Sequence, residues 1–319
     1  MTADCPLVVR TPAELLALLP YLLGYHPHDS IALIGLHGRD LDFGACFDLP
    51  PPDRGEEAAR DVAGAVARQR ADAVVIVGYG PPRRVTPIAL HVTEALRAAG
   101  VRIDDVLRVD GGRWWSYLCE DPGCCPPEGS ACLPPDSVIA AEATYLGQVA
   151  LPSREDLIAQ VAAVQGPARE GMVAATERAR SRFPGLLNDV RRIRRAGRLA
   201  VREAEKRYRS GAALTDDEVA WLGALLTDRV VEDYALDRTS AHHWRVRLWT
   251  DVVRRVEPAY VPGPACLLGF AAWRMGWGPL ARAAVDRALR AEPGHQLARM
   301  LFEILGAGIP PGAMSRRDG

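Results

Sequence analysis

The hydrophobic and polar positions of the chain follow different periods in its two halves. In the first half, short apolar runs are separated by longer stretches with helical spacing, which predicts strands and helices in alternation. The predicted strands are residues 31–36, 41–49, 73–80, 101–109 and 113–119. Helices are predicted after Thr11, over residues 56–70, and from Thr86 to Ala99. The order β-β-α-β-α-β-β predicts an α/β domain with a mixed sheet over residues 1–150.

From about residue 137 the strand signals stop, and only helical spacing remains. The predicted helical stretches are residues 137–147, 154–164, 168–182, 187–209, 216–237 and 241–257. A Pro-Ser pair at Pro152 and Ser153 marks the change between the two patterns. The second half therefore predicts an all-α helical domain over residues 151–319.

Small residues recur at a regular spacing near the end of this domain. Leu268, Gly269, Ala281, Ala288 and Pro293 match the tetratricopeptide pattern, which places small residues between two helices and a proline after the second. One repeat alone builds no solenoid, so the segment predicts a tetratricopeptide-like helical hairpin docked on the rest of the domain. An ordinary helical hairpin with small contact residues is the alternative.

Composition narrows the range of partners. Hydrophobic residues at 48% and charged residues at 25% are typical of a globular chain, and 319 residues exceed what one core usually organises. A net charge of −1 gives no overall attraction to nucleic acid or to anionic lipid. The basic residues 191–209 leave an RNA contact open, but acidic residues follow them and internal pairing is expected. We expect a protein partner at the helical domain and leave the oligomeric state open.

The apolar run at residues 15–25 is not expected to be a signal peptide. It is short, Pro20 and Gly24 interrupt it, and Thr11 with Glu14 forms the sequence of a capping box before a folded helix. No other run reaches the roughly 18 to 20 apolar residues of a membrane span. We therefore expect a cytoplasmic protein, whose thiols stay reduced.

Cysteines supply the main chemical signal. Cys119, Cys124, Cys125 and Cys132 give the pattern C-x4-C-C-x6-C, which in a reducing compartment favours metal or redox chemistry over a disulfide. Zinc is the candidate cofactor, with Cys119, Cys124 and Cys125 as ligands and His26 or Cys132 to complete the shell. The spacing lacks a second two-cysteine knuckle, so redox or thiolate chemistry and a structural loop of packed thiols are alternatives.

Aromatic residues precede the cysteines on the last predicted strand. Alternation places Arg113, Trp115 and Tyr117 on one face and Trp114 and Ser116 on the other. The first set offers a stacking surface for a planar ligand, and core packing is the alternative.

Two turns that contain glycine or histidine are further candidate binding sites. The stretch GYHPHDS offers His26, His28, Asp29 and Ser30 as metal ligands or as an acid/base pair, or it forms an ordinary turn. The stretch VGYGPPR lacks the third glycine of a dinucleotide loop, and Pro81 and Pro82 remove amides that would bind phosphate. No dinucleotide is predicted.

These stretches together resemble a known family. The chain resembles an actinobacterial family catalogued as domain of unknown function 4192. The stretches that carry the resemblance are TPAELLALLPYLLGYHPHDSIALIGL, FDLP, RWWSYLCEDPGCCPPEG and AAWRMGWGPLARAAVDRAL. The family pattern includes His26, Ser30, Asp48, Arg113, Trp115, Cys119, Cys124 and Cys125, and it leaves out His28 and Cys132. The resemblance implies where a site lies, and it implies no activity, substrate or cofactor.

Two functions follow from these residues. The first is a non-catalytic binding or scaffolding protein, whose cysteine-aromatic loop holds a ligand or metal. The second is a metal- or thiol-dependent enzyme, such as a hydrolase, with Cys124 or Cys125 as thiolate or ligand and His26 as acid/base. The second function requires the His26 turn and the cysteine loop to meet in space.

Overall fold

The computed structural model describes residues 8–38, 40–69, 71–182 and 189–312. These ranges leave out Cys5, Arg39, the expected helix end at Arg70 and the expected helix start at Leu187. The chain forms two compact units, which are described separately. One unit comprises Met1–Asp156 together with Gly306–Gly319, and the other comprises Leu157–Leu305.

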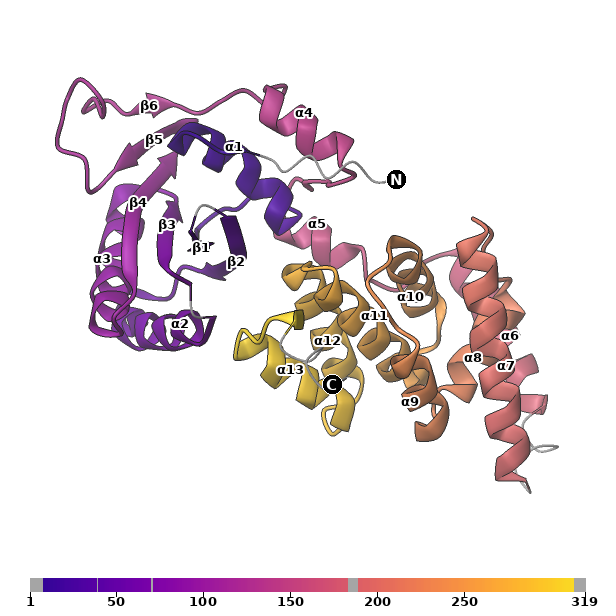
Figure 1. Ribbon diagram of the computed structural model, residues 1–319. Coiled ribbons are helices and arrows are strands. Elements are labelled where there is room, and N and C mark those ends of the chain that lie inside the picture. The colour runs from indigo at the N-terminus through magenta and orange to yellow at the C-terminus, as the bar shows by residue number, and fades with distance from the viewer. Residues whose placement is uncertain (1–7, 39, 70, 183–188, 313–319) are drawn as a thin grey trace. The chain divides into compact units, whose positions relative to one another are not determined.

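The first unit is built on a six-stranded sheet with helices (Figure 1), and the predicted mixed sheet is confirmed. Its strands are β1 (Ser30–His37), β2 (Asp40–Asp48), β3 (Ala73–Tyr79), β4 (Arg102–Asp110), β5 (Arg113–Ser116) and β6 (Ser130–Ala131). Their order in the sheet is β2-β1-β3-β4-β5-β6, and β3 and β4 are its parallel pair. Strand β6 was not predicted, because two residues are too few to show a period.

Helices cover the sheet of the first unit. They are α1 (Pro12–Leu23), the short 3-10 helix η1 (Pro52–Arg54), α2 (Gly55–Gln69), α3 (Pro82–Ala98) and α4 (Val138–Tyr145), followed by α5 (Arg154–Ala159) at the boundary. One buried cluster joins α2 and α3 to β1, β3 and β4, and includes Ile31, Val62, Ile76, Val92 and Val106. Helix α3 packs so closely on β3 that a Cβ on Gly78 would lie 2.1 Å from Val85 Cγ1. Close packing therefore accounts for a glycine in the VGYGPPR stretch.

Two helix starts in this unit test the sequence expectations. The capping box before α1 is confirmed, because Thr11 Oγ1 accepts from the Glu14 amide and Glu14 Oε2 accepts from the Thr11 amide. The expected start at Thr86 is wrong, since α3 begins at Pro82 and Pro87 lies inside it. Proline at the first helical position has its φ already set and needs no amide partner there, so Pro82 begins the helix one turn earlier.

The second unit is entirely helical in its described residues. Its helices are α6 (Pro167–Arg182), α7 (Val190–Arg209), α8 (Asp216–Leu225), α9 (Arg229–Asp237), α10 (His243–Arg255), α11 (Pro262–Arg274), α12 (Gly278–Ala291) and α13 (Gln296–Gly306), with the 3-10 helix η3 (Pro258–Tyr260) before α11. A single helix over residues 216–237 was wrong, because Asp228 caps a new helix by accepting from the Val230 and Val231 amides. Helix α13 was not predicted at all.

Charged side chains fix several helices of this unit to one another. The carboxylate of Glu205 is 2% exposed and accepts hydrogen bonds from Arg238 and from the buried Arg245. On the basic helix α7, Arg207 pairs with Glu218 at 2.6 Å and Arg194 lies 3.6 Å from Asp228. Part of the basic segment is therefore paired internally.

Across the described residues, no helix combines the length and the apolar character needed to cross a membrane.

Candidate metal centre

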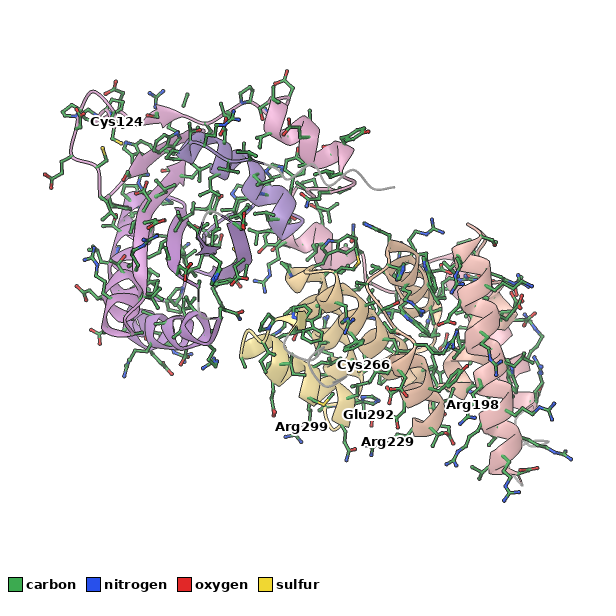
Figure 2. The ribbon with its side chains drawn as sticks, viewed as in Figure 1. Cys124, Arg198, Arg229, Cys266, Glu292 and Arg299 are labelled. Atoms are coloured by element: carbon green, nitrogen blue, oxygen red, sulfur yellow. The ribbon has the colours of Figure 1, made fainter. Side chains whose placement is uncertain are left out.

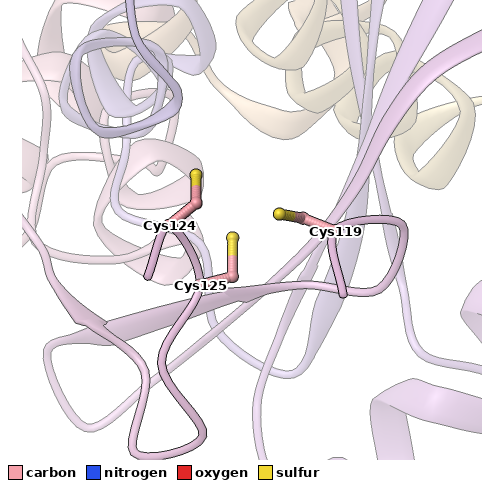
Figure 3. Close-up of side chains that lie close together, drawn as sticks. All are labelled: Cys119, Cys124 and Cys125. Carbon is pink, nitrogen blue, oxygen red and sulfur yellow. The ribbon is translucent and has the colours of Figure 1, made fainter. Parts of the chain in front are cut away.

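Three cysteines of the loop between β5 and β6 converge in space. The sulfur atoms of Cys119, Cys124 and Cys125 all lie within 4.8 Å of one another. Figure 3 shows the three side chains directed into one small volume, with Cys119 approaching from the opposite limb of the loop. Cys124 is exposed and the other two are partly buried. The loop thus presents a sulfur cluster that solvent can reach.

A tight turn at Asp121 brings the two limbs together. Its carbonyl oxygen accepts from the amides of Cys124 at 3.1 Å and Cys125 at 2.7 Å, and its carboxylate accepts from the Gly123 amide. The first limb is fixed by Ser116, whose Oγ accepts from the Cys119 amide and donates to Asp105. These hydrogen bonds therefore fix the backbone that carries the three cysteines.

Arg113 and Trp115 hold the second limb of the loop. Arg113 donates to the carbonyl oxygens of Glu128 and Gly129, and the Trp115 indole donates to the Pro127 carbonyl at 3.0 Å. The guanidinium of Arg108 lies 3.7 Å from the centre of the Trp115 ring. Arg113 and Trp115, two of the three side chains expected to form a stacking surface, are thus engaged with the protein itself.

The remaining residues of this strand contact the body of the α/β unit. Tyr117 packs against the buried cluster under α2 and α3, and its hydroxyl lies 2.6 Å from Thr86 Oγ1. Trp114 is 8% exposed. The loop is anchored at its base by these two rings.

The surroundings of Cys119 and Cys125 shift the pKa values of their thiols in opposite directions. A hydrogen bond from the Asp121 amide, followed by one from the Cys125 thiol, lowers the pKa of Cys119. Burial, followed by hydrogen bonds to Cys119 and Cys124, raises the pKa of Cys125 to about 12. Cys119 therefore becomes a thiolate, the form that binds metal, at a lower pH than Cys125.

The GYHPHDS turn is held by its own contacts. The His26 amide donates to the Leu151 carbonyl, and Asp29 adopts a left-handed φ of 41° while its carboxylate pairs with Arg84 at 2.9 Å. His26 is largely exposed, and the partial burial of its ring, followed by the charge of His28, lowers its pKa. Neither His26 nor Cys132 contributes a ligand atom to the group formed by Cys119, Cys124 and Cys125, whose sulfur atoms lie within 4.8 Å of one another.

A second polar group, which the sequence did not reveal, lies where β1 begins and β3 ends. Ser30 is 3% exposed, and its strand neighbours are Asp48 and Tyr79. Asp48 pairs with Arg154, and burial raises the pKa of both Cys46 and Tyr79. The candidates Ser30 and Asp48 thus belong to this end of the sheet and not to the sulfur cluster. Only strand pairing across the sheet brings these residues together, so no local motif signals them.

Three converging thiols match the chemistry of zinc. Thiolate sulfur is a preferred zinc ligand, and zinc takes four ligands in a tetrahedron, so three cysteines leave one position for another donor. The amide of Asp121 turned toward the sulfur of Cys119 is the backbone feature that accompanies cysteine ligands in zinc knuckles. The residues present therefore fit a zinc-class ion.

Fold and site together define a two-unit protein, in which an α/β unit carries an exposed three-cysteine loop and a helical unit follows. The chain matches the family described as Domain of unknown function (DUF4192) over residues 12–312, and it belongs to that family. Searches among curated proteins and among solved structures found no match to the chain.

Proposed function

We propose that this protein is a non-catalytic metal-binding protein, whose loop cysteines Cys119, Cys124 and Cys125 bind one zinc ion. The observation that carries the proposal is the convergence of their sulfur atoms to within 4.8 Å of one another. Zinc sites with sulfur ligands at about 2.3 Å place the sulfurs somewhat under 4 Å apart, so only small side-chain movements are needed.

The fourth position of this site faces solvent, because Cys124 is exposed. Water, or a donor atom from a bound partner, completes the tetrahedron there. The loop then acts as a rigid recognition element, because Arg113 and Trp115 fix one limb and Ser116 fixes the other. In the reducing cytoplasm, the compartment we propose, the thiols remain available to the metal.

The alternative, a metal- or thiol-dependent enzyme, has less geometric support. It requires His26 to share a proton or a metal with the loop cysteines, and His26 is not part of the sulfur group. The side chains of Arg113 and Trp115 bind the loop backbone, which leaves them without a separate role in holding a substrate. The geometry therefore favours binding over catalysis.

For the helical unit we propose that α11 and α12 form a tetratricopeptide-like pair that serves partner binding. Leu268, Gly269, Ala281 and Ala288, the positions of the repeat pattern, are buried in these two helices. A Cβ on Gly269 would lie 2.8 Å from Val285 Cγ2, which explains a glycine at this contact. These observations support the close contact between α11 and α12, and they point to no particular partner.

The metal proposal is tested by elemental analysis of the full chain purified without chelators. The variant with Cys119→Ser, Cys124→Ser and Cys125→Ser is expected to contain about one zinc ion per chain less than the wild type. Cys132→Ser is the matched control, because Cys132 lies directly after β6 and outside the sulfur group. Cobalt substitution gives a second readout, since thiolate ligands produce a charge-transfer absorption that the triple replacement should reduce.

Equal zinc content in the wild type and in the variant that lacks the three cysteines would contradict the proposal. If Cys132→Ser also lost zinc, the three cysteines Cys119, Cys124 and Cys125 would not by themselves account for the zinc site. Three thiols that all react with an alkylating reagent in the freshly purified protein would favour a loop of packed thiols.

A further inference from the structure

A second group of ligand atoms lies inside the helical unit, far along the chain from the cysteine loop. Single ligand atoms of Glu232, Cys266 and His295 all lie within 4.8 Å of one another. Glu232 comes from α9, Cys266 from α11, and His295 from the residue before α13. Figure 2 labels Cys266 within the helical unit. Three separate segments thus direct an oxygen, a sulfur and a nitrogen at one point.

The carboxylate of Glu232 is buried, and one of its two oxygens accepts no hydrogen bond from the described residues. The residue is 6% exposed, and its Oε1 has no hydrogen-bond partner among the described residues. His295 Nε2 is 3.4 Å away, outside hydrogen-bond geometry. A Cβ on Gly263 would lie 3.5 Å from Oε1, so the glycine leaves room for this oxygen. An unpaired buried charge is strongly unfavourable, and a cation beside it removes the penalty.

The other two ligands complete a set that suits zinc. Cys266 is fully buried, and its sulfur lies 3.6 Å from His295 Nδ1. In a tetrahedral zinc site with bonds of about 2.3 Å to sulfur and 2.0 Å to nitrogen, these atoms lie about 3.5 Å apart. His295 Nδ1 accepts from the Ala298 amide here, so zinc bound at Nδ1 takes the place of that hydrogen bond. The His295 side chain is 16% exposed, which provides an entry path from solvent and a side for a fourth ligand.

We infer that Glu232, Cys266 and His295 form a metal site of their own, for a divalent cation of the zinc class, in the helical unit. The site does not depend on the cysteine loop. On binding, the Cys266 thiol releases its proton to solvent and the metal joins α9, α11 and the start of α13. Its role is to tie these helices together.

The test uses the full chain that already carries Cys119→Ser, Cys124→Ser and Cys125→Ser, so that only the helical site remains. The metal-free protein is titrated with Zn²⁺ against a chromophoric chelator, and melting temperatures are recorded with and without Zn²⁺. The test variants are Glu232→Gln and His295→Asn. Asparagine keeps a helix cap before α13, where His295 Nδ1 accepts from the Ala298 amide, and removes the imidazole.

We expect this background to bind about one Zn²⁺ and to melt at a higher temperature with it. Glu232→Gln and His295→Asn are expected to weaken binding at least about tenfold. The matched controls Glu303→Gln and His242→Asn, on α13 and before α10, should bind like the background. No zinc in the background, or equal affinity in the two test variants, would overturn the inference.

A fold control comes from the metal-free proteins. Glu232→Gln removes an unpaired buried charge, so its metal-free melting temperature should equal or exceed that of the background. Lost metal binding in that variant then cannot be attributed to unfolding. A lower metal-free melting temperature would mean that the carboxylate already has a favourable partner, and it would also overturn the inference.

Discussion

Arg113 donates a 2.6 Å hydrogen bond from Nη2 to the carbonyl oxygen of Gly129, and so joins strand β5 to the far limb of the cysteine loop. A second bond, from Nε to the Glu128 carbonyl, fixes the direction of the guanidinium. The Arg113 side chain thus holds the limb of the loop that follows Cys124 and Cys125.

Arg113→Met should weaken zinc binding by the loop about 10- to 100-fold, because a residue that orients metal ligands has an effect of that size. The measurement is competition for zinc with a chromophoric chelator. Arg102→Met is the control, since it removes an exposed arginine of the neighbouring strand β4 that pairs with Asp104. Equal affinity in both variants would show that the loop positions its sulfurs without Arg113.

Gly129→Ala should destabilise the α/β unit more than Gly112→Ala does. Both glycines have left-handed φ values, 79° and 75°, where alanine is unfavourable by roughly 1 to 2 kcal/mol. Only at Gly129 would the new Cβ meet another group, because it would lie 2.5 Å from Trp115 Cε2. Denaturant unfolding measures the difference, which we expect to be about 1 to 3 kcal/mol. Equal losses would mean that the Trp115 ring moves aside freely.

Cys119 should react with iodoacetamide at a lower pH than Cys132 in metal-free protein. Hydrogen bonds lower the pKa of Cys119, whereas burial raises that of Cys132. Thiolate is the reactive form, so the midpoint of the rate against pH follows each pKa. Mass spectrometry of peptides measures the two profiles, and their midpoints do not depend on differences in access. The reverse order would contradict the hydrogen bonding seen at Cys119.

Gly269→Ala should destabilise the helical unit by about 1 to 3 kcal/mol, the usual effect of overpacking. Its Cβ would lie 2.8 Å from Val285 Cγ2 and 3.4 Å from the Ala281 carbonyl, so α11 and α12 would have to separate. Gly278→Ala in α12 meets nothing within 4 Å and should be neutral or stabilising, because alanine favours helix. Denaturant unfolding that fails to distinguish the two variants would contradict a close contact at Gly269.

Local signals along the chain were sufficient for the kinds of elements and for one of the two ligand groups. The apolar runs predicted strands β1 to β5, and two of these strands, β1 and β3, are buried along almost their whole length. The adjacent cysteines marked the sulfur loop, because its ligands lie within one short turn around Asp121. Two expected helix boundaries were wrong. Asp228 caps a new helix and Pro82 begins α3 before Thr86, so in both cases a single residue sets a boundary that hydrophobic periodicity does not show.

The chain by itself thus determined an α/β half, a helical half and a cysteine loop, because strand period, helix period and a local turn are all properties of neighbouring residues. Tertiary structure alone decided which distant side chains meet. Glu232, Cys266 and His295 stand singly in the sequence, and the packing of α9, α11 and α13 brings their ligand atoms within 4.8 Å. Ser30, Asp48 and Tyr79 likewise become neighbours only through strand pairing. Such contacts depend on how elements pack against each other, and no pattern within one element carries that information.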